Sequence, residues 1–261
     1  MVSKPKPPSY SRPPVREAII DIQIEPLPIE ILPNLEKCGV QLKSRYPKIK
    51  SRYQDKIQME FSDTNFVSKK DRIQFGYIFQ SSDEKMWVQM RLDGFTFNLL
   101  KPDPHASWPG WPYLKSEAKR AWEKFVKATG ILEIKRLGVR YINQIVISGE
   151  DKIELEDYLT EPPRIPAGLP RDLQHFFSRI EVVNPNPRAV VIITQAPAPQ
   201  PYQNQTTFTL DIDVVREQRI SLKSFNLWKA LDRFRDLKNS VFEASVKPKT
   251  KQLFGPGGVI K

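Results

Sequence analysis

The chain has 261 residues, of which 39% are hydrophobic and 10% aromatic, enough apolar material for a sizeable core. Its 41 lysines and arginines outnumber 30 acidic residues, and the net charge of +11 makes nucleic acids and acidic proteins the partner classes to consider. The single cysteine, Cys38, excludes an internal disulfide, and no apolar run approaches the roughly 20 residues needed to cross a bilayer. We therefore expect a cytoplasmic protein with no membrane partner.

In the first half of the chain, apolar and polar residues alternate over 17–25, which predicts a strand. Residues 32–46 have the pattern of a helix. Three strands and a closing helix are predicted to follow, over 74–80, 86–92, 95–101 and 112–129. Gly94, in the turn between the second and third of these strands, is expected to supply the positive φ of a tight hairpin.

The second half repeats this order of elements. A strand over 138–147 and a short helical stretch over 169–177 are predicted to precede strands over 179–183, 189–195 and 207–215 and a helix over 226–246. Both closing helices carry one apolar stripe, which alternating strands can bury on a sheet. The outer face of the last helix is expected to face solvent, with Lys229, Asp232, Arg233, Arg235, Asp236 and Lys238.

These patterns predict an α+β fold of two layers, in which a curved antiparallel sheet packs against long helices. The repeated order favours two β-α-β-β-β-α halves in a saddle-like arrangement. Prolines gather between the predicted elements, and a strand flanked by Pro187 and Pro197 is expected at an exposed edge, which leaves a homo-oligomer open. The predicted organisation is a flexible arm (1–16), one compact body of two related halves (17–255; about 17–130 and 131–255) and a tail (256–261).

Basic residues concentrate in 43–56 and in the last fifteen residues, and Tyr46 and Tyr53 are interleaved with the first group. Lysine and arginine neutralise phosphates, and aromatic rings stack on unpaired bases. The predicted nucleic-acid or partner-binding residues are Lys43, Arg45, Lys48, Lys50, Arg52, Tyr53, Lys56, Lys247, Lys249 and Lys251. An acidic protein partner accounts for the same charges, and a basic helix end that runs into a loop can also be merely solvated.

The sequence shows no recognisable catalytic constellation. His105 and His175 have no second histidine or cysteine at metal-ligand spacing, and neither a glycine-rich phosphate loop nor a nucleophile elbow occurs. We therefore assign no catalytic residue and no cofactor, and the sequence favours a non-enzymatic role over an enzymatic one.

Two aspartates are the remaining candidates for metal ligands. Asp211 and Asp213 project to the same face of a strand, where two carboxylates could hold a divalent cation, and Asp21 could join them. The alternative is that they form the wet side of a half-buried strand and are neutralised by Arg140 or Arg216.

Three polar residues of one predicted central strand, Arg140, Tyr141 and Asn143, are candidates for a concave sheet surface. Tyr141 and Asn143 can instead complete hydrogen bonds inside the protein, because buried polar groups require partners.

Several segments together resemble an uncharacterised family of about this length, which is distributed sporadically across bacteria and archaea. They are PPVREAIIDIQIE (13–25), RLGVRYINQI (136–145), LEDYL (155–159), LPRDLQHFFSRI (169–180), LDIDV (210–214), LWKALDRFRDLKNSVFEASV (227–246) and LFG (253–255). The resemblance implies no activity, cofactor or catalytic residue. A sporadic distribution is typical of mobile genes, including defence and toxin-antitoxin modules.

The leading prediction is a non-enzymatic accessory protein of a bacterial or archaeal cytoplasm that binds a macromolecule. One alternative is a nucleic-acid-binding protein that uses its basic surface. The other is a metal-dependent enzyme or small-ligand binder that uses the concavity of the sheet.

Overall fold

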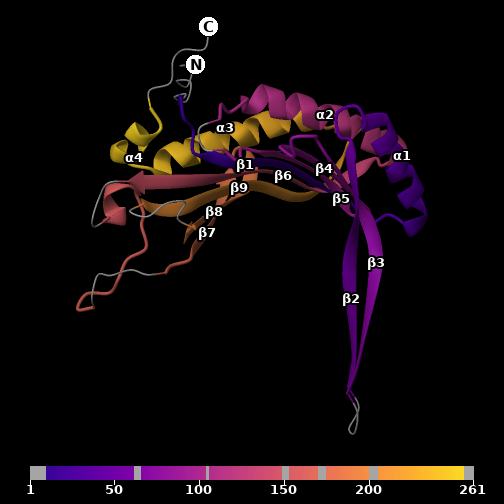
Figure 1. Ribbon diagram of the computed structural model, residues 1–261, viewed down its shortest axis with the longest axis horizontal. Helices are drawn as coiled ribbons and strands as arrows, with labels where there is room; N and C mark the ends of the chain where they lie inside the picture. The colour runs from indigo at the N-terminus through magenta and orange to yellow at the C-terminus, as the bar shows by residue number, and fades with distance from the viewer. Residues whose placement is uncertain are drawn as a thin grey trace.

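The computed structural model describes residues 10–61, 66–103, 106–148, 153–169, 175–199 and 205–255 (Figure 1). Nine strands form one antiparallel sheet in the order β2-β3-β4-β5-β1-β6-β9-β8-β7. The strands are β1 (Val15–Gln23), β2 (Lys48–Phe61), β3 (Phe66–Gln80), β4 (Met86–Arg91), β5 (Gly94–Leu100), β6 (Glu133–Ser148), β7 (Ser178–Pro185), β8 (Arg188–Pro197) and β9 (Gln205–Ser221). The helices are α1 (Leu32–Leu42), α2 (Gly110–Thr129), α3 (Leu227–Ser245) and α4 (Pro248–Leu253), and single 3₁₀ turns occur at Ile29–Ile31 and Leu155–Asp157.

All four helices lie on the same side of the sheet (Figure 1). Every second residue of the central strands points toward them, and Ile20, Phe97 and Ile212 are fully buried there. The apolar stripes of α2 and α3 supply the other half of this core, for example through Phe125 and Leu231. No helix of the described residues lies over the opposite side of the sheet, and we call this side the open face.

The sheet extends beyond the helices at both ends. The main contacts between helices and sheet involve β3, β4, β5, β6 and β9. At one end the hairpin of β2 and β3 projects away from the body, and at the other end β7 and β8 bend in the same direction (Figure 1). We call the first projection the arm and the second the limb.

The predicted fold class, a two-layer structure of a sheet packed against long helices, is wrong. One nine-stranded sheet forms the body of the protein, and its strands β6 and β9 have 16 and 17 residues. The helices cover only part of that sheet, and α1 and α4 have only 11 and 6 residues. The sequence of 43–56 is typical of a helix end that runs into a loop, but residues 48–56 belong to β2. Among the described side chains at the start of β2, 48–51 and 53–55 are exposed on both faces, so this sequence lacks the apolar alternation of a half-buried strand.

The predicted repeat of two β-α-β-β-β-α halves is also wrong. Where the second half should place its first helix, the described residues contain only the 3₁₀ turn Leu155–Asp157. Within the predicted helical stretch 169–177, residues 170–174 lie outside the described part and the others are not helical. The two halves nevertheless share one sheet, because β1 pairs directly with β6.

The edge of the sheet also differs from the prediction. The strand flanked by Pro187 and Pro197 is β8, which lies between β9 and β7 and therefore has a neighbour on each side. The terminal strand at this end is β7. Among the described strands, β7 and β2 are the two that each have only one neighbour.

Gly94 is needed for a reason other than the predicted positive φ, which it does not have. A Cβ at this position would lie 2.4 Å from the carbonyl oxygen of Ile22, so β5 and β1 could not keep their spacing with a larger residue.

Part of the predicted N-terminal arm packs on the body. The Tyr10 ring contacts the rings of Phe242 and Phe254, and its hydroxyl donates a hydrogen bond of 2.8 Å to Glu243. Val15 and Arg16 already belong to β1.

None of the helices in the described part is long and apolar enough to span a membrane.

Candidate functional site

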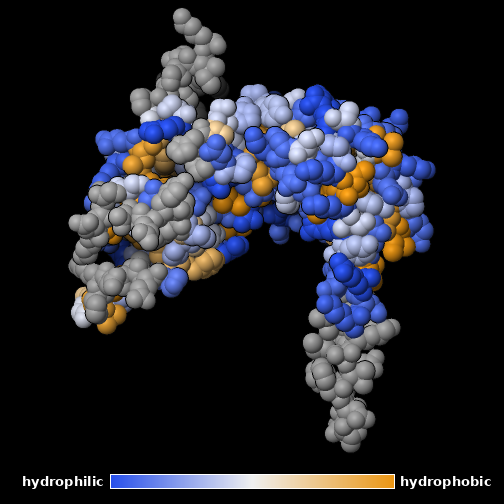
Figure 2. All heavy atoms as spheres, viewed as in Figure 1, coloured by the Kyte–Doolittle hydropathy of each residue, from blue (hydrophilic) through white to orange (hydrophobic). Residues whose placement is uncertain are grey.

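The open face is polar, although it belongs to a sheet whose other face is apolar. Along β1, Ile20 and Ile22 point into the core, and Glu17, Ile19 and Asp21 project to the open face. The arm and the limb extend past this face on either side, and the space-filling view shows a hollow between them (Figure 2). A large molecule can therefore approach the open face from the side opposite the helices.

Six charged side chains from four strands lie together at the centre of the open face, four of them linked by ion pairs and two forming an adjacent pair. The Nη1 atom of Arg136 donates to Asp21 at 2.5 Å, and its Nη2 atom donates to Asp213 at 3.2 Å. Arg91 lies 3.4 Å from the other oxygen of Asp21, to which Thr96 also donates at 2.7 Å. The members of this central network are Asp21, Arg91, Arg136, Arg140, Asp211 and Asp213.

Arg140 and Asp211 form the part of the central network that is most accessible. The Nε atom of Arg140 donates to Asp211 at 2.9 Å, and Nη2 donates to the second carboxylate oxygen, so the pair is bidentate. This pair raises the pKa of the Arg140 guanidinium. The Arg140 side chain is 45% exposed, whereas the other five members are between 9% and 20% exposed.

The burial of these charges needs an explanation other than stability. Moving two ions out of water costs about as much as their attraction returns, so a buried ion pair is weak evidence for stabilisation. What the network provides is orientation, since each carboxylate and guanidinium is held by partners on neighbouring strands. The open face thus carries charges whose positions are fixed before any partner arrives.

Asp213 is the member of the central network whose ionisation is most opposed by burial. Burial, with a smaller contribution from the carboxylates of Asp211 and Asp21, raises its pKa to about 6, against the lowering effect of Arg136 and Arg140. The folded-state pKa therefore lies above the value of an unfolded chain. Ionised Asp213 destabilises the fold above pH 6, and this penalty disappears as the pH falls toward 4.

We expect Asp213→Asn to gain stability relative to the wild type as the pH rises from 4.5 to 7.5. The difference in unfolding free energy between variant and wild type should shift by about 2 kcal/mol across this interval, because only the wild type gains from protonation. Chemical denaturation at both pH values measures this difference. A difference that does not change with pH would show that Asp213 is not desolvated.

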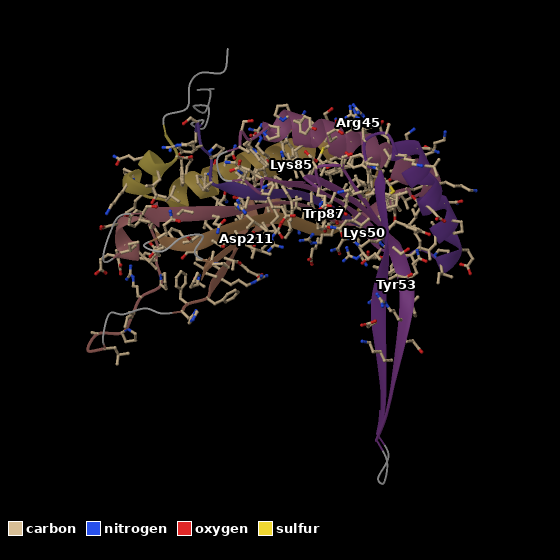
Figure 3. The ribbon with its side chains drawn as sticks, viewed as in Figure 1. Arg45, Lys50, Tyr53, Lys85, Trp87 and Asp211 are labelled. Carbon is tan, nitrogen blue, oxygen red and sulfur yellow. The ribbon has the colours of Figure 1, made fainter. Side chains whose placement is uncertain are left out.

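A second polar group lies where the arm joins the body. Arg52 on β2 donates to Gln89, Gln89 donates to Asn98 at 2.9 Å, and Asn98 donates to Glu17 at 2.6 Å. These bonds link the base of the arm to β1 across the open face. In Figure 3, Asp211, Trp87 and Lys50 mark the course of this face from β9 to β2.

The predicted basic residues do not form one surface. Lys48, Lys50 and Arg52 alternate along β2 and face the hollow, whereas Tyr53 lies on the other face of the arm beneath Arg72, at 4.5 Å. The side chain of Lys56 lies outside the described residues.

The other members of the predicted basic surface lie elsewhere. Lys43 follows α1, and Arg45 forms an ion pair of 2.9 Å with the buried Glu117 on the helix side. Lys247, Lys249 and Lys251 belong to the α4 region at the far end of the molecule (Figure 1). Lys249 approaches Asp157 to 3.3 Å, and Lys251 approaches Glu243 to 2.9 Å.

The structure places the three candidates of β6 on opposite faces. Arg140 faces the hollow, but Tyr141 and Asn143 are buried beneath the helices. Asn143 donates to the carbonyl of Leu210 at 2.9 Å, and the Lys238 ammonium lies 3.8 Å from the centre of the Tyr141 ring. Tyr141 and Asn143 therefore make contacts inside the protein and do not contribute to the open face.

The candidate metal ligands are occupied by guanidinium groups. Asp211 is held by Arg140, and Asp213 shares Arg136 with Asp21, so the three aspartates named from the sequence do meet in space. Cations of the chain stand where a bound metal would have to stand. Among the described residues, no group of three or more histidine, cysteine or acidic side chains has the arrangement of a metal site.

Arg91, Thr96 and Arg136 were missed by the sequence analysis. Their signal was the polar phase of alternating strands, since Thr96 lies between the buried Phe95 and Phe97. That phase places a residue on the open face, but it does not tell which strands are neighbours. The position of β1 between β5 and β6 brings these residues together.

Two pockets of about 510 and 530 Å³ occur near the end of β9, where it approaches the helices. One is lined by Ile24, Leu132 and Arg219 among others, and the other by Trp122, Phe225 and Trp228. No member of the central network lines either pocket. Neither of them therefore connects the network to a small-ligand site.

No family model matches the sequence, and no curated protein matches it. A solved structure, that of the di-domain ARO/CYC StfQ from the steffimycin biosynthetic pathway, aligns with 91% of this chain and 97% of its own chain. The identity is 10% and the TM-score is 0.21, so the similarity carries no argument about fold or function.

Proposed function

We propose that this protein is a non-enzymatic binding protein that docks a protein partner on the open face of its sheet, between the arm and the limb. The observation that carries the proposal is the central network: six ionic side chains fixed by mutual contacts on a face that no helix covers. The cellular role predicted from the family resemblance, in a defence or toxin-antitoxin module, is part of the proposal.

Fixed charges of both signs suit recognition of another protein. Complementary charges set the orientation of a partner and penalise wrong partners, more than they add raw affinity. Side chains already held by ion pairs also lose little conformational freedom when a partner binds. The accessible guanidinium of Arg140, beside Asp211, offers a contact for a carboxylate or carbonyl group of such a partner.

The centre of the open face does not suit a phosphate backbone. Nucleic-acid affinity comes from cations that neutralise phosphates. Here the carboxylates of Asp21, Asp211 and Asp213 stand among the arginines and already neutralise them. A nucleic acid would meet about as much negative as positive charge at this position.

One observation favours nucleic acid at a different place, the arm. Lys48, Lys50 and Arg52 alternate on the side of β2 that faces the hollow, and a two-stranded ribbon fits the major groove of a duplex. Lys48 is paired with Glu84 at 2.7 Å, which leaves Lys50 and Arg52 as the cations that would contact phosphate. The arm is therefore the site of the second candidate function.

Affinity purification from the native host, with matched charge reversals, tests the first proposal. We expect wild type and Lys119→Glu, on the outer face of α2, to retain the same partner protein. Arg140→Glu should lower its recovery by about tenfold or more, because a contact between charged groups is lost and reversed. Thr194→Arg, which alters the open face on β8 without breaking an ion pair, should do the same.

Folding and the nature of the partner are controlled in the same experiment. Circular dichroism and thermal melting exclude variants that unfold, and nuclease treatment of the purified complex should leave the partner bound. A partner retained by both open-face variants would contradict the proposal. Bound nucleic acid that Lys50→Glu releases, and that dissociates steeply with salt, would replace it with the second function.

A further inference from the structure

In the part of the chain that the structure describes, no strand pairs with the outer edge of β7. Exposed strands usually carry bulges, inward charges or short lengths that prevent pairing. β7 instead pairs with β8 over eight residues in one unbroken register. Its large apolar side chains are unusually open to solvent: Ile180 is 44% exposed, Val182 47% and Val183 78%, and Phe177 just before the strand is 71% exposed.

The geometry of the adjoining turn determines which backbone groups of β7 point outward. Residues 186 and 187 form a two-residue turn, so Pro185 and Arg188 are the pair that closes the hairpin. Hydrogen-bonding pairs alternate along an antiparallel ladder, and Pro185 and every second residue before it face β8. The amide and carbonyl groups of Ser178, Ile180 and Val182 therefore point away from the sheet.

We propose that two copies of this chain associate through their β7 strands and form one continuous antiparallel sheet. In the symmetric register Ile180 stands opposite Ile180 of the second copy. Arg179 then stands opposite Glu181 of the second copy, and Glu181 opposite its Arg179. The same register places Phe177 opposite Val183 of the second copy, so the two most exposed large apolar residues of the described chain cover each other.

The charges on β7 select this register. Arg179 and Glu181 already form an ion pair of 2.7 Å within one strand, and pairing of two copies completes a ring of four alternating charges. A slip that centres the pair on Arg179 puts two arginines opposite each other, and a slip to Glu181 puts two glutamates opposite each other. Like charges directly opposite one another destabilise a strand pair.

The interface that this pairing creates is small. It consists of one strand pair and the contacts of Phe177 and Val183, so it falls below the size of a permanent interface, and we expect a dissociation constant in the micromolar range. The proposal does not depend on the docking function of the open face.

Cysteine cross-linking tests the register directly. In a background of Cys38→Ser, which removes the buried native thiol, Ile180→Cys should form a disulfide-linked dimer under mild oxidation, because opposite Cα atoms in an antiparallel pair are about 5.5 Å apart. Val182→Cys is the matched control. Position 182 stands opposite Ser178 of the second copy, so two such cysteines lie too far apart to be bridged.

Sedimentation over a wide concentration range tests the charge pairing independently. Arg179→Glu should weaken dimerisation by about tenfold or more, because it sets like charges opposite each other at two symmetric positions. The double exchange Arg179→Glu with Glu181→Arg should restore it. A wild-type chain that sediments as a monomer throughout, or equal cross-linking at positions 180 and 182, would overturn the proposal, as would pairing of β7 only with a strand of another protein.

Discussion

Lys238→Met is expected to stabilise the protein strongly at pH 6 and hardly at all at pH 10. Lys238 is buried between α3 and β6, and burial lowers its pKa to about 7, with the nearby charge of Arg235 adding to the effect and Glu243 opposing it. An unfolded chain keeps this lysine protonated up to about pH 10.4, so between pH 7 and 10 the unfolded state binds more protons and stability rises with pH.

The full penalty of the Lys238 charge is therefore present below pH 7. It amounts to about 5 kcal/mol from the shift in pKa, and the lost contact of the ammonium with the Tyr141 ring reduces the expected gain to about 3 to 5 kcal/mol. Methionine has a similar length and no charge, so it can occupy the same space.

Urea denaturation at pH 6, 8 and 10 measures the gain from Lys238→Met. Lys229→Met is the control, because Lys229 lies exposed on the same helix and should change stability by less than about 0.5 kcal/mol at every pH. A gain from Lys238→Met that is the same at pH 6 and pH 10 would mean that the ammonium keeps its water in the folded state.

Arg136→Met is expected to destabilise the protein by about 3 to 5 kcal/mol at pH 7.5. Arg136 neutralises both Asp21 and Asp213, and it also lies 3.8 Å from Glu217. Without it, two largely buried carboxylates lose their shared cation. Protonation of Asp213 should reduce the loss at pH 5, since its pKa already lies near 6 in the wild type and rises further without the arginine.

Two comparisons separate the loss of charge pairing from the loss of packing. The triple variant Arg136→Met, Asp21→Asn and Asp213→Asn should recover most of the stability, because it leaves no uncompensated charge. Arg219→Met removes an exposed ion pair with Glu25 and should cost about 1 kcal/mol or less. If Arg136→Met lowered the free energy of unfolding no more than Arg219→Met, the central network would contribute no more to stability than an exposed ion pair.

The alternation of apolar and polar residues predicted most elements of the sheet but not its extent. Strands with one buried face, such as β1 and β9, show a period of two that places Asp21, Asp211 and Asp213 together on the polar side. The arm has no buried face, and its strand β2 therefore gave no such signal. The order of strands, which brings Asp21 to Arg136, depends on contacts far apart in the chain.

The prediction that Lys238 faces solvent was wrong, although the sequence contained the signal against it. Phe234, Lys238 and Phe242 follow each other at four-residue steps and lie on one stripe, and all three are buried. The charge of Lys238 favours solvent, whereas its position along the helix places it on the apolar stripe. Its contact with Tyr141 follows from the packing of α3 over β6.

The location of β1 in the middle of the sheet constrains how the nascent chain can mature on the ribosome. Its two neighbours are β5 and β6, so β1 has an incomplete set of partners until β6 has been synthesised. At a synthesis rate of about 5 to 20 residues per second, this interval is on the order of ten seconds. Until then one edge of β1 is unpaired, and unpaired strand edges make a nascent chain prone to aggregation.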